Sequence, residues 1–284
     1  MHFGIYAPNS PEQGIVETQR LEQRLRHQIG IVNWYQHWGG WGPEFNPSWV
    51  DNVVRSGRLP LLTWEPWAPG PASQPEYALS RISDGAYDGY IRRWARAVGA
   101  YGRTIYLRPM HEMNGDWYPW GGTVDRNSPQ EYVAAWRRIW RIFEQERATN
   151  VRWVWSPNHE DVPATPGNAF ERYYPGDRYV DVLALDGYNW GGAFPQYGGW
   201  RTFDAIFGCA YERIARLGTQ PIWIAETASA SEGGDKAAWV EDMFTAATRY
   251  PRLQAVVWFH ADKERDWRAT SSRRVARAFA ATRP

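Results

Sequence analysis

Short runs of apolar, β-branched and aromatic residues recur along the 284-residue chain, and turn residues bound each run. Such runs are typical of buried β-strands, because a strand covered on both faces has no polar side. The pattern therefore predicts eight strands, near residues 2–7, 29–38, 59–67, 104–112, 151–158, 181–190, 221–229 and 253–262.

Amphipathic stretches lie between the predicted strands. From residue 84 to 102, apolar positions recur at helical spacing. Ser128, Pro129 and Glu131 form a helix start, with an N-cap serine, a first-position proline and a glutamate three residues after the cap. Residues 161–176, rich in Pro and Gly, form the least regular connection. Further helices are predicted over 12–28, 46–57, 202–217, 235–249 and 271–281.

Eight strands that alternate with helices favour a closed parallel barrel. A doubly wound open sheet is the alternative, but such sheets rarely need eight regular repeats. No change in composition and no Gly/Ser/Pro-rich linker marks a second domain. The sequence therefore predicts an α/β fold, a single-domain (β/α)₈ TIM barrel over residues 1–284.

Charge and composition argue against several classes of partner. With 32 basic and 31 acidic residues the net charge is +1, so nothing indicates a nucleic-acid or anionic-membrane partner. No uncharged apolar stretch is long enough to span a bilayer. The single Cys209 cannot form an intramolecular disulfide and is expected to pack as a small hydrophobe. The chain gives no signal for oligomerisation, and a monomer is the default expectation.

Strand-like sequence begins at Phe3, so no signal peptide is expected in this stretch. The expected location is outside the cell, with a leader that is absent from this sequence. A cytoplasmic location is the alternative that the residues leave open.

The 19 tryptophans and 16 tyrosines are unusual for a chain of this length. One interpretation is that large rings fill a big core, and Trp94, Trp136 and Trp140, which lie in helical patterns, fit it. Other tryptophans sit among glycines, prolines and polar residues. On exposed loops such rings could stack on flat, polyhydroxylated ligands; the set is Trp38, Trp41, Trp67, Trp117, Trp120, Trp190, Trp200 and Trp267.

Polar and aromatic residues also fall at the carboxyl ends of the predicted strands, where barrel enzymes assemble their sites. Glycoside hydrolysis needs one acid to protonate the leaving oxygen and one carboxylate to attack the anomeric carbon or activate water. Glu112 and Glu226 are the best pair. Strand alternation would point both toward the barrel axis; the alternative is two surface carboxylates. The strand-end set is Glu65, Glu112, Asn158, Tyr188, Glu226 and Trp258.

Two runs carry a resemblance to a known family. The run from Arg108 to Gly115, Arg-Pro-Met-His-Glu-Met-Asn-Gly, and the run Trp-Ile-Ala-Glu over 223–226 resemble the acid/base and nucleophile motifs of glycoside hydrolase family 26. Residues 153–158, residues 186–191 and Trp258 extend the similarity over most of the barrel. That family contains β-mannanases, mixed-linkage β-glucanases and some xylanases.

The resemblance implies a retaining hydrolase in which Glu112 is the acid/base and Glu226 the nucleophile. His111 would orient the carboxylates or touch the sugar, a role that needs a local bulge; a core histidine is the alternative. Tyr188 would donate a hydrogen bond to Glu226, although a core ring is the alternative. Arg108 would pair with a carboxylate of the site, or form a structural salt bridge.

The remaining candidates would bind or support the substrate. Trp258 would form the floor under the sugar, with a core tryptophan as the alternative. Glu65 could bond a substrate hydroxyl and is the acid most easily mistaken for Glu112. The full supporting set is His111, Arg108, Tyr188, Trp117, Trp120, Trp258, Trp190, Asn158, Glu65 and Trp67. No cofactor and no metal are expected, since there is no His-Glu-x-x-His run and only one Cys.

The predicted partner is a polysaccharide or oligosaccharide. The runs 117–120 and 266–268 look more like the mixed-linkage glucanase branch, which predicts an endo-acting β-1,3-1,4-glucanase (lichenase). An endo-β-1,4-mannanase of the same family is the first alternative. A barrel that binds carbohydrate without cleaving it, and an exo-acting or transglycosylating enzyme, are the others.

Overall fold

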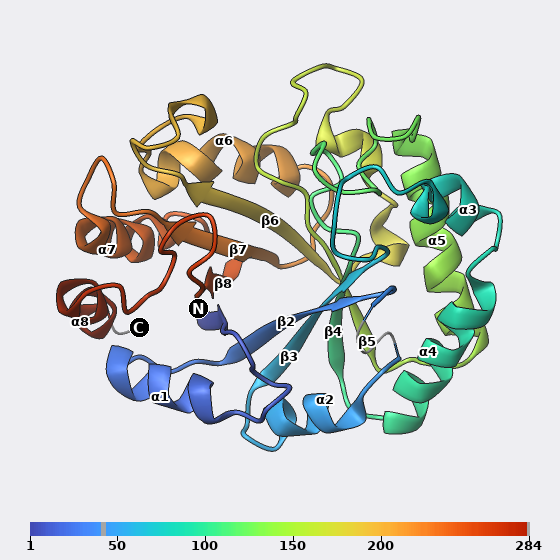
Figure 1. The fold of residues 1–284 in the computed structure, drawn as a ribbon, viewed down its shortest axis with the longest axis horizontal. Helices are drawn as coiled ribbons and strands as arrows, with labels where there is room; N and C mark the ends of the chain where they lie inside the picture. Colours follow the sequence, from blue (N-terminus) through green and yellow to red (C-terminus); the bar gives the residue numbers. More distant parts are fainter. Residues whose placement is uncertain (41–43, 283–284) are drawn as a thin grey trace. The chain divides into compact units, whose positions relative to one another are not determined.

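The computed structural model describes residues 1–40 and 44–282, and its eight strands form one closed barrel in the order β1 to β8 (Figure 1). The first and last strands pair in parallel, with His2 opposite Ala255 and Tyr6 opposite Phe259. The predicted (β/α)₈ barrel is confirmed. The strands are β1 His2–Tyr6, β2 Ile31–His37, β3 Leu59–Glu65, β4 Ile105–Pro109, β5 Val151–Trp155, β6 Val182–Asn189, β7 Ile222–Ser229 and β8 Leu253–Phe259.

Helices follow the strands much as the amphipathic stretches predict. Ser128 caps α5, and its Oγ accepts a hydrogen bond from the Glu131 N–H at 3.2 Å. None of the described helices is long and apolar enough to cross a membrane. The α-helices are α1 Val16–Leu25, α2 Pro47–Val54, α3 Leu79–Ser83, α4 Asp88–Tyr101, α5 Pro129–Gln145, α6 Phe203–Ala215, α7 Lys236–Ala247 and α8 Arg273–Ala281, and the 3₁₀ turns are η1 Pro75–Tyr77, η2 Phe170–Tyr173, η3 Asp177–Tyr179 and η4 Pro195–Tyr197.

Packing within the chain groups its residues into two compact units. The Glu226 unit consists of Met1–Trp34, Asn52–Leu59 and Ala184–Pro284, and the Glu112 unit of Tyr35–Asp51 and Pro60–Leu183. Strands β2, β3 and β6 each contribute residues to both units. The predicted boundaries of one domain over residues 1–284 stay a prediction.

An aromatic cluster fills the core of the Glu112 unit. The Trp64 ring lies 4.8 Å from Trp38 and 4.7 Å from Trp94, measured between ring centroids. The expectation of exposed loop rings is wrong for Trp38, Trp120 and, in the other unit, Trp267, all of which are buried. Trp41 lies outside the described residues. These three buried rings fill the core. The glycines, prolines and polar residues around them in the sequence had favoured exposed loops instead.

A second aromatic cluster packs β1 and β8 against helices of the Glu226 unit. The Phe3 ring lies 5.9 Å from Phe244 and 5.4 Å from Phe279. Cys209 is exposed on α6, so its predicted packing as a small hydrophobe is wrong. The helix needs no apolar side chain at that position, because Phe207 and Ala210 cover the buried face around it.

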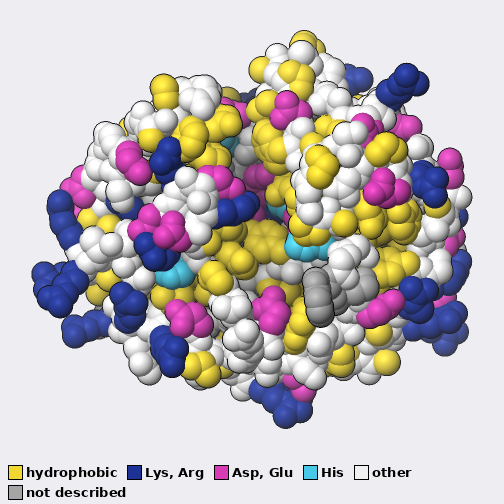
Figure 2. All heavy atoms as spheres, in the orientation of Figure 1, with side chains coloured by type: hydrophobic (Ala, Val, Ile, Leu, Met, Phe, Trp, Pro, Cys, Tyr) yellow, Lys and Arg dark blue, Asp and Glu magenta, His cyan; other side chains and the backbone are white. Residues whose placement is uncertain are grey.

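Charges of both signs are interspersed over the surface. On the face that Figure 2 shows, Lys and Arg side chains lie beside Asp and Glu side chains. Examples are Arg93 with Glu44 at 3.0 Å and Arg249 with Asp204 at 3.4 Å. This mixture matches the net charge of +1.

Candidate active site

Glu226 lies inside strand β7, all of whose residues are buried. The pairing of β7 with β8 shifts between Ile224 and Thr227, so β7 carries one extra residue there and Glu226 sits in a bulge. The hydroxyl of Tyr188 on β6 donates a hydrogen bond to Oε1 of Glu226. Simple strand alternation therefore does not set the direction of this carboxylate; the bulge and the tyrosine do.

The ring of Tyr188 is supported by the loop that follows β8, residues 260–269. Trp267 is 1% exposed, and its ring lies 5.0 Å from the Tyr188 ring. The loop is closed by hydrogen bonds from the Trp267 N–H to the Ala261 carbonyl at 2.9 Å and from Lys236 Nζ to the Asp266 carbonyl at 2.7 Å. Burial lowers the pKa of Lys236 to about 8. The sequence placed Trp267 in this region but gave it no supporting role.

Trp258 is not a platform for the sugar. Its side chain is 0% exposed, and its ring lies 5.9 Å from Trp239 and 5.1 Å from Phe279, which belong to α7 and α8. Its Nε1 donates to the Trp267 carbonyl at 2.7 Å. The predicted floor role is therefore wrong. Trp258 is a core residue that anchors the loop after β8.

Trp190 comes directly after β6 and is half-buried. Its ring lies 5.2 Å from Trp267 and 4.8 Å from Tyr197, and Tyr197 is 48% exposed. Arg265 lies 4.1 Å from the ring centroid of Phe194 in the same cluster. Trp190, Phe194 and Tyr197 form an accessible aromatic surface, so sugar contact by Trp190 stays a prediction that the structure permits.

Glu112 is held by a different kind of backbone. Strand β4 ends at Pro109, and Met110 (φ 49°) and Glu112 (φ 52°) both adopt the left-handed conformation. The prediction that this strand extends to residue 112 is wrong. The strand alternation that pointed Glu112 toward the barrel axis therefore does not apply. The Glu112 N–H donates to the Ser156 carbonyl at 2.7 Å, which ties this turn to the chain after β5. Such strain in a non-glycine residue is typical of functional sites.

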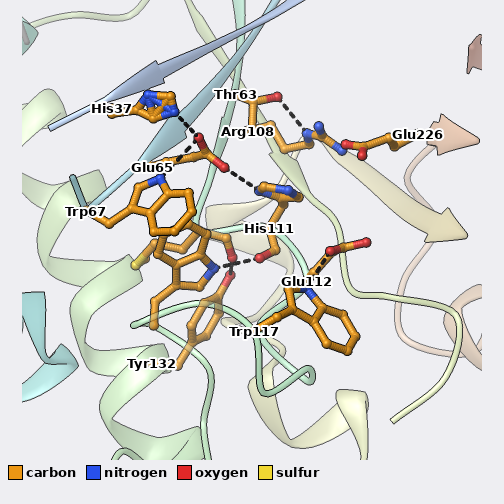
Figure 3. A network of polar contacts seen from close by, with 12 residues as sticks. His37, Thr63, Glu65, Trp67, Arg108, His111, Glu112, Trp117, Tyr132 and Glu226 are labelled. Atoms are coloured by element: carbon orange, nitrogen blue, oxygen red, sulfur yellow. Dashed lines mark hydrogen bonds and ion pairs between the residues drawn. The ribbon is translucent and has the colours of Figure 1, made fainter. Parts of the chain in front are cut away.

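The indole of Trp117 contacts the Glu112 carboxylate directly. Its Nε1 donates to Oε2 at 2.7 Å, as Figure 3 shows. Gly115 makes room for this ring, because a Cβ at that position would lie 2.4 Å from the indole. The glycine of the His-Glu-Met-Asn-Gly run therefore has a steric reason. Sequence reasoning placed Trp117 among the substrate-binding residues and missed its bond to the acid.

Glu65 lies among imidazole and indole groups at the end of β3 (Figure 3). His37 Nε2 is 3.0 Å from Oε2, Trp67 Nε1 is 3.4 Å from Oε2, and His111 Nδ1 is 3.9 Å from Oε1. Burial lowers the pKa of His37, which favours a neutral ring that donates N–H to the carboxylate. Glu65 is thus engaged with His37, Trp67 and His111, and this favours a supporting role over that of the catalytic acid.

His111, which lies between these two left-handed residues in the sequence, is completely buried. Its ring lies 5.0 Å from Tyr118, and its carbonyl accepts a hydrogen bond from Trp120 Nε1 at 2.6 Å. Trp120 is 0% exposed and stacks on Tyr118 at 4.3 Å. The predicted contact of Trp120 with substrate is therefore wrong; it fixes the backbone beside Glu112. A role for His111 in the site required an irregular backbone, and the left-handed residues on either side of it provide one.

Arg108 is also buried, on β4. Its Nε donates to Thr63 Oγ1 at 2.9 Å, and the guanidinium lies 5.9 Å from the centroid of the Tyr35 ring. A buried guanidinium of this kind needs several partners to offset its desolvation. Its predicted pairing with a carboxylate of the site stays a prediction.

Asn158 belongs to an amide network that joins the loops after β4 and β5. The Asn158 N–H donates to Asn114 Oδ1 at 2.8 Å, and Asn114 Nδ2 donates to the Asn158 carbonyl and to Asp161 Oδ1, both at 2.9 Å. Sequence reasoning did not assign Asn114 or Asp161 a role. The network indicates that Asn158 holds the loops in place, and its predicted sugar contact stays a prediction.

Comparison with known proteins agrees with these residues. The sequence profile of Glycosyl hydrolase family 26 matches residues 86–250, more than half of the chain. The chain is 39% identical to Endoglucanase H of Acetivibrio thermocellus over 98% of its own length and 30% of that protein. It is 40% identical to Mannan endo-1,4-beta-mannosidase A and B of Caldalkalibacillus mannanilyticus over 31% of its length and 17% of that protein. It thus spans under a third of these curated relatives.

Solved structures show the same fold. A GH26 β-mannanase from Bacteroides ovatus matches with a TM-score of 0.70 at 19% identity, over 99% of this chain and 88% of that one. The catalytic domain of the Bacillus sp. JAMB-750 GH26 endo-β-1,4-mannanase matches with a TM-score of 0.73 at 17% identity, over 99% and 85%. With the profile match and the barrel, the chain belongs to glycosyl hydrolase family 26, whose members are retaining glycoside hydrolases.

Proposed function

We propose that the chain is an endo-acting β-glycanase in which Glu226 is the nucleophile and Glu112 the acid/base. Glu226 would attack the anomeric carbon and form a covalent glycosyl–enzyme while Glu112 protonates the departing oxygen. Glu112 would then take a proton from the water that releases the sugar. The configuration at the anomeric carbon is retained because two displacements occur.

The observation that carries this proposal is the hydrogen bond from Tyr188 to Glu226. A buried carboxylate is costly unless polar groups satisfy it, and the tyrosine hydroxyl satisfies one oxygen of Glu226 and fixes the position of the carboxylate. Trp117 holds one oxygen of Glu112 in a comparable way. Both carboxylates come from motifs that resemble those of the family.

The proposed substrate is a glucan, with mixed-linkage β-1,3-1,4-glucan first. The support is the relative named Endoglucanase H, since the alignment with it extends over 98% of this chain. Because a polysaccharide does not enter a cell, we expect the protein to act outside the cell.

Mannan is the second candidate. Several relatives named mannan endo-1,4-beta-mannosidase match 31–64% of the chain, and the solved structures above are mannanases. Glucose and mannose differ at C2, so discrimination depends on a few hydrogen bonds to one hydroxyl.

The test is reducing-sugar release from barley mixed-linkage glucan, galactomannan and xylan by the wild type, Glu112→Ala and Glu226→Ala. Glu212→Ala, on an exposed carboxylate of α6, is the matched control. We expect cleavage of the glucan into a ladder of internal fragments, lost in both site variants and kept in the control. Cleavage of galactomannan alone would move the assignment to the mannanase, and a folded wild type inactive on all three would contradict the proposal.

A further inference from the structure

A cavity of about 500 Å³ opens within the Glu226 unit. Its wall is made by the loop after β1, the first turns of α1 and the loop after β8, and it includes Gln13, Arg20 and His260. Glu226, Tyr188 and Trp267 do not line it. Its volume falls in the range of about 300–1,000 Å³ that small-molecule sites occupy.

His260 lines this wall, and a backbone hydrogen bond defines its tautomer. The Ala269 N–H donates to Nδ1 of His260 at 3.0 Å, so Nδ1 carries no proton and the neutral ring carries its proton on Nε2. Burial, followed by the positive charges of Lys236 and Arg268, lowers the pKa of His260 to about 4, which agrees with a neutral ring. The side chain is 6% exposed, so its orientation is fixed by the surrounding protein.

The charged groups of the wall compensate one another. Arg20 lies 3.6 Å from Glu17, and Arg268 lies 3.2 Å from Asp262. Two cations and two carboxylates leave no net charge to attract an ion. Asn9 and Gln13 add amide groups, which both donate and accept hydrogen bonds. Such a mixture of donors and acceptors without net charge suits a neutral, polyhydroxylated ligand.

We propose that this cavity is a second sugar-binding site, which holds one glycosyl unit of a polysaccharide away from the bond that is cleaved. The inference rests on the proposed glycanase function and adds a site to it. The loop after β8 supplies His260, Asp262 and Arg268 to the cavity and Trp267 to the ring of Tyr188. One loop therefore contacts both the bound sugar unit and the support of the nucleophile.

The test is calorimetric titration of cellohexaose, cellotriose and mannohexaose into the Glu226→Ala protein, with and without a second substitution. His260→Asn keeps an acceptor near Nδ1 for the Ala269 N–H and removes the Nε2 donor. Gln13→Ala removes an exposed amide, and Gln19→Ala, on α1 but outside the cavity, is the matched control. We expect His260→Asn and Gln13→Ala each to weaken hexasaccharide binding about tenfold, the effect of one lost hydrogen bond, and to leave cellotriose and the control unchanged.

In otherwise wild-type protein the same two substitutions should raise KM for the cleaved polysaccharide more than they lower kcat. Hexasaccharide affinities that stay equal across all variants, or an absence of binding by either hexasaccharide, would overturn the second site. An unchanged affinity beside normal polysaccharide cleavage leaves the glycanase function intact. If the two substitutions weaken hexasaccharide binding but the wild type cleaves no polysaccharide, the proposed function is overturned and the second site is kept.

Discussion

The two candidate catalytic carboxylates are held by different local structures. Glu226 is part of a strand and is turned by a bulge, while the hydroxyl of Tyr188 on the neighbouring strand fixes its position. Glu112 follows a strand, in a turn with two left-handed residues, and the indole of Trp117 from the same loop fixes its position. In the proposed mechanism, the nucleophile Glu226 must approach one carbon and is held by the barrel wall. The proposed acid/base Glu112 must serve a leaving group and then a water, and it is held by a loop.

The largest expected effects come from removing either carboxylate. We expect Glu226→Ala to lower kcat by on the order of 10⁶-fold, as with other removed nucleophiles, and Glu112→Ala by roughly 10²–10⁴-fold. Added azide separates the roles: it should yield a β-glycosyl azide with Glu112→Ala and an α-glycosyl azide with Glu226→Ala. NMR of the products reads the configuration, and the reverse pattern would exchange the two assignments.

The Glu226 unit should also respond to acid through His260. The pKa of His260 is about 4 in the folded protein against an ordinary value of 6.5, so the unfolded chain binds more protons as pH falls from 6.5 to 4. The contribution of the neutral ring to the free energy of unfolding is complete above pH 6.5 and is lost over this window, on the order of 3 kcal/mol. Denaturant titrations at pH 7 and pH 4 should show a smaller acid loss for His260→Asn than for the wild type. Equal losses would contradict a neutral His260.

The two hydrogen bonds to the carboxylates can be compared directly. Tyr188→Phe removes a donor to a carboxylate, and Trp117→Phe removes a donor to a carboxyl group that becomes charged as it gives up its proton. Each bond is worth about 1.5–3 kcal/mol or roughly 10–100-fold in rate. With a dinitrophenyl glycoside, whose leaving group needs no proton, kcat/KM should fall for Tyr188→Phe and stay near wild type for Trp117→Phe. With the polysaccharide, both values should fall. Equal losses on both substrates would indicate that Trp117 acts on more than proton transfer.

The smallest expected effect concerns the space beside Trp117. In Gly115→Ala the added methyl would meet the indole at 2.4 Å, so the ring must move and its bond to Glu112 weakens. We expect a loss of about tenfold on the polysaccharide, no larger than that of Trp117→Phe. Gly89→Ala, on α4 with open space around the position, is the control and should keep full activity. Full activity in Gly115→Ala would show that the indole bond is not needed.

Sequence alone predicted the barrel and placed Glu226 on its seventh strand, because strand and helix periods are local properties of the chain. The conformation around Glu112 could not be predicted in this way. Left-handed φ angles at Met110 and Glu112 are disfavoured locally and are stabilised by tertiary contacts, such as the bond from the Glu112 N–H to Ser156.

Tertiary contacts also decide which tryptophans are buried and which are accessible. Trp120 and Trp258 lie near strand ends, as sugar-binding rings would, but each is fully buried and donates Nε1 to a backbone carbonyl. The sequence around them gives no signal of those acceptors, which come from residues 111 and 267. Trp117 has a similar local sequence and is partly accessible, with its N–H on the acid.

The most direct test of the central claim is to trap the covalent intermediate. The wild type is treated with a 2-deoxy-2-fluoro dinitrophenyl glycoside of the disaccharide unit of its substrate, digested, and analysed by peptide mass spectrometry. We predict a glycosyl label on the peptide that contains Glu226, with one sugar per protein and loss of activity in step with labelling. A label on Glu65 or Glu112 instead would contradict the assignment of Glu226 as the nucleophile.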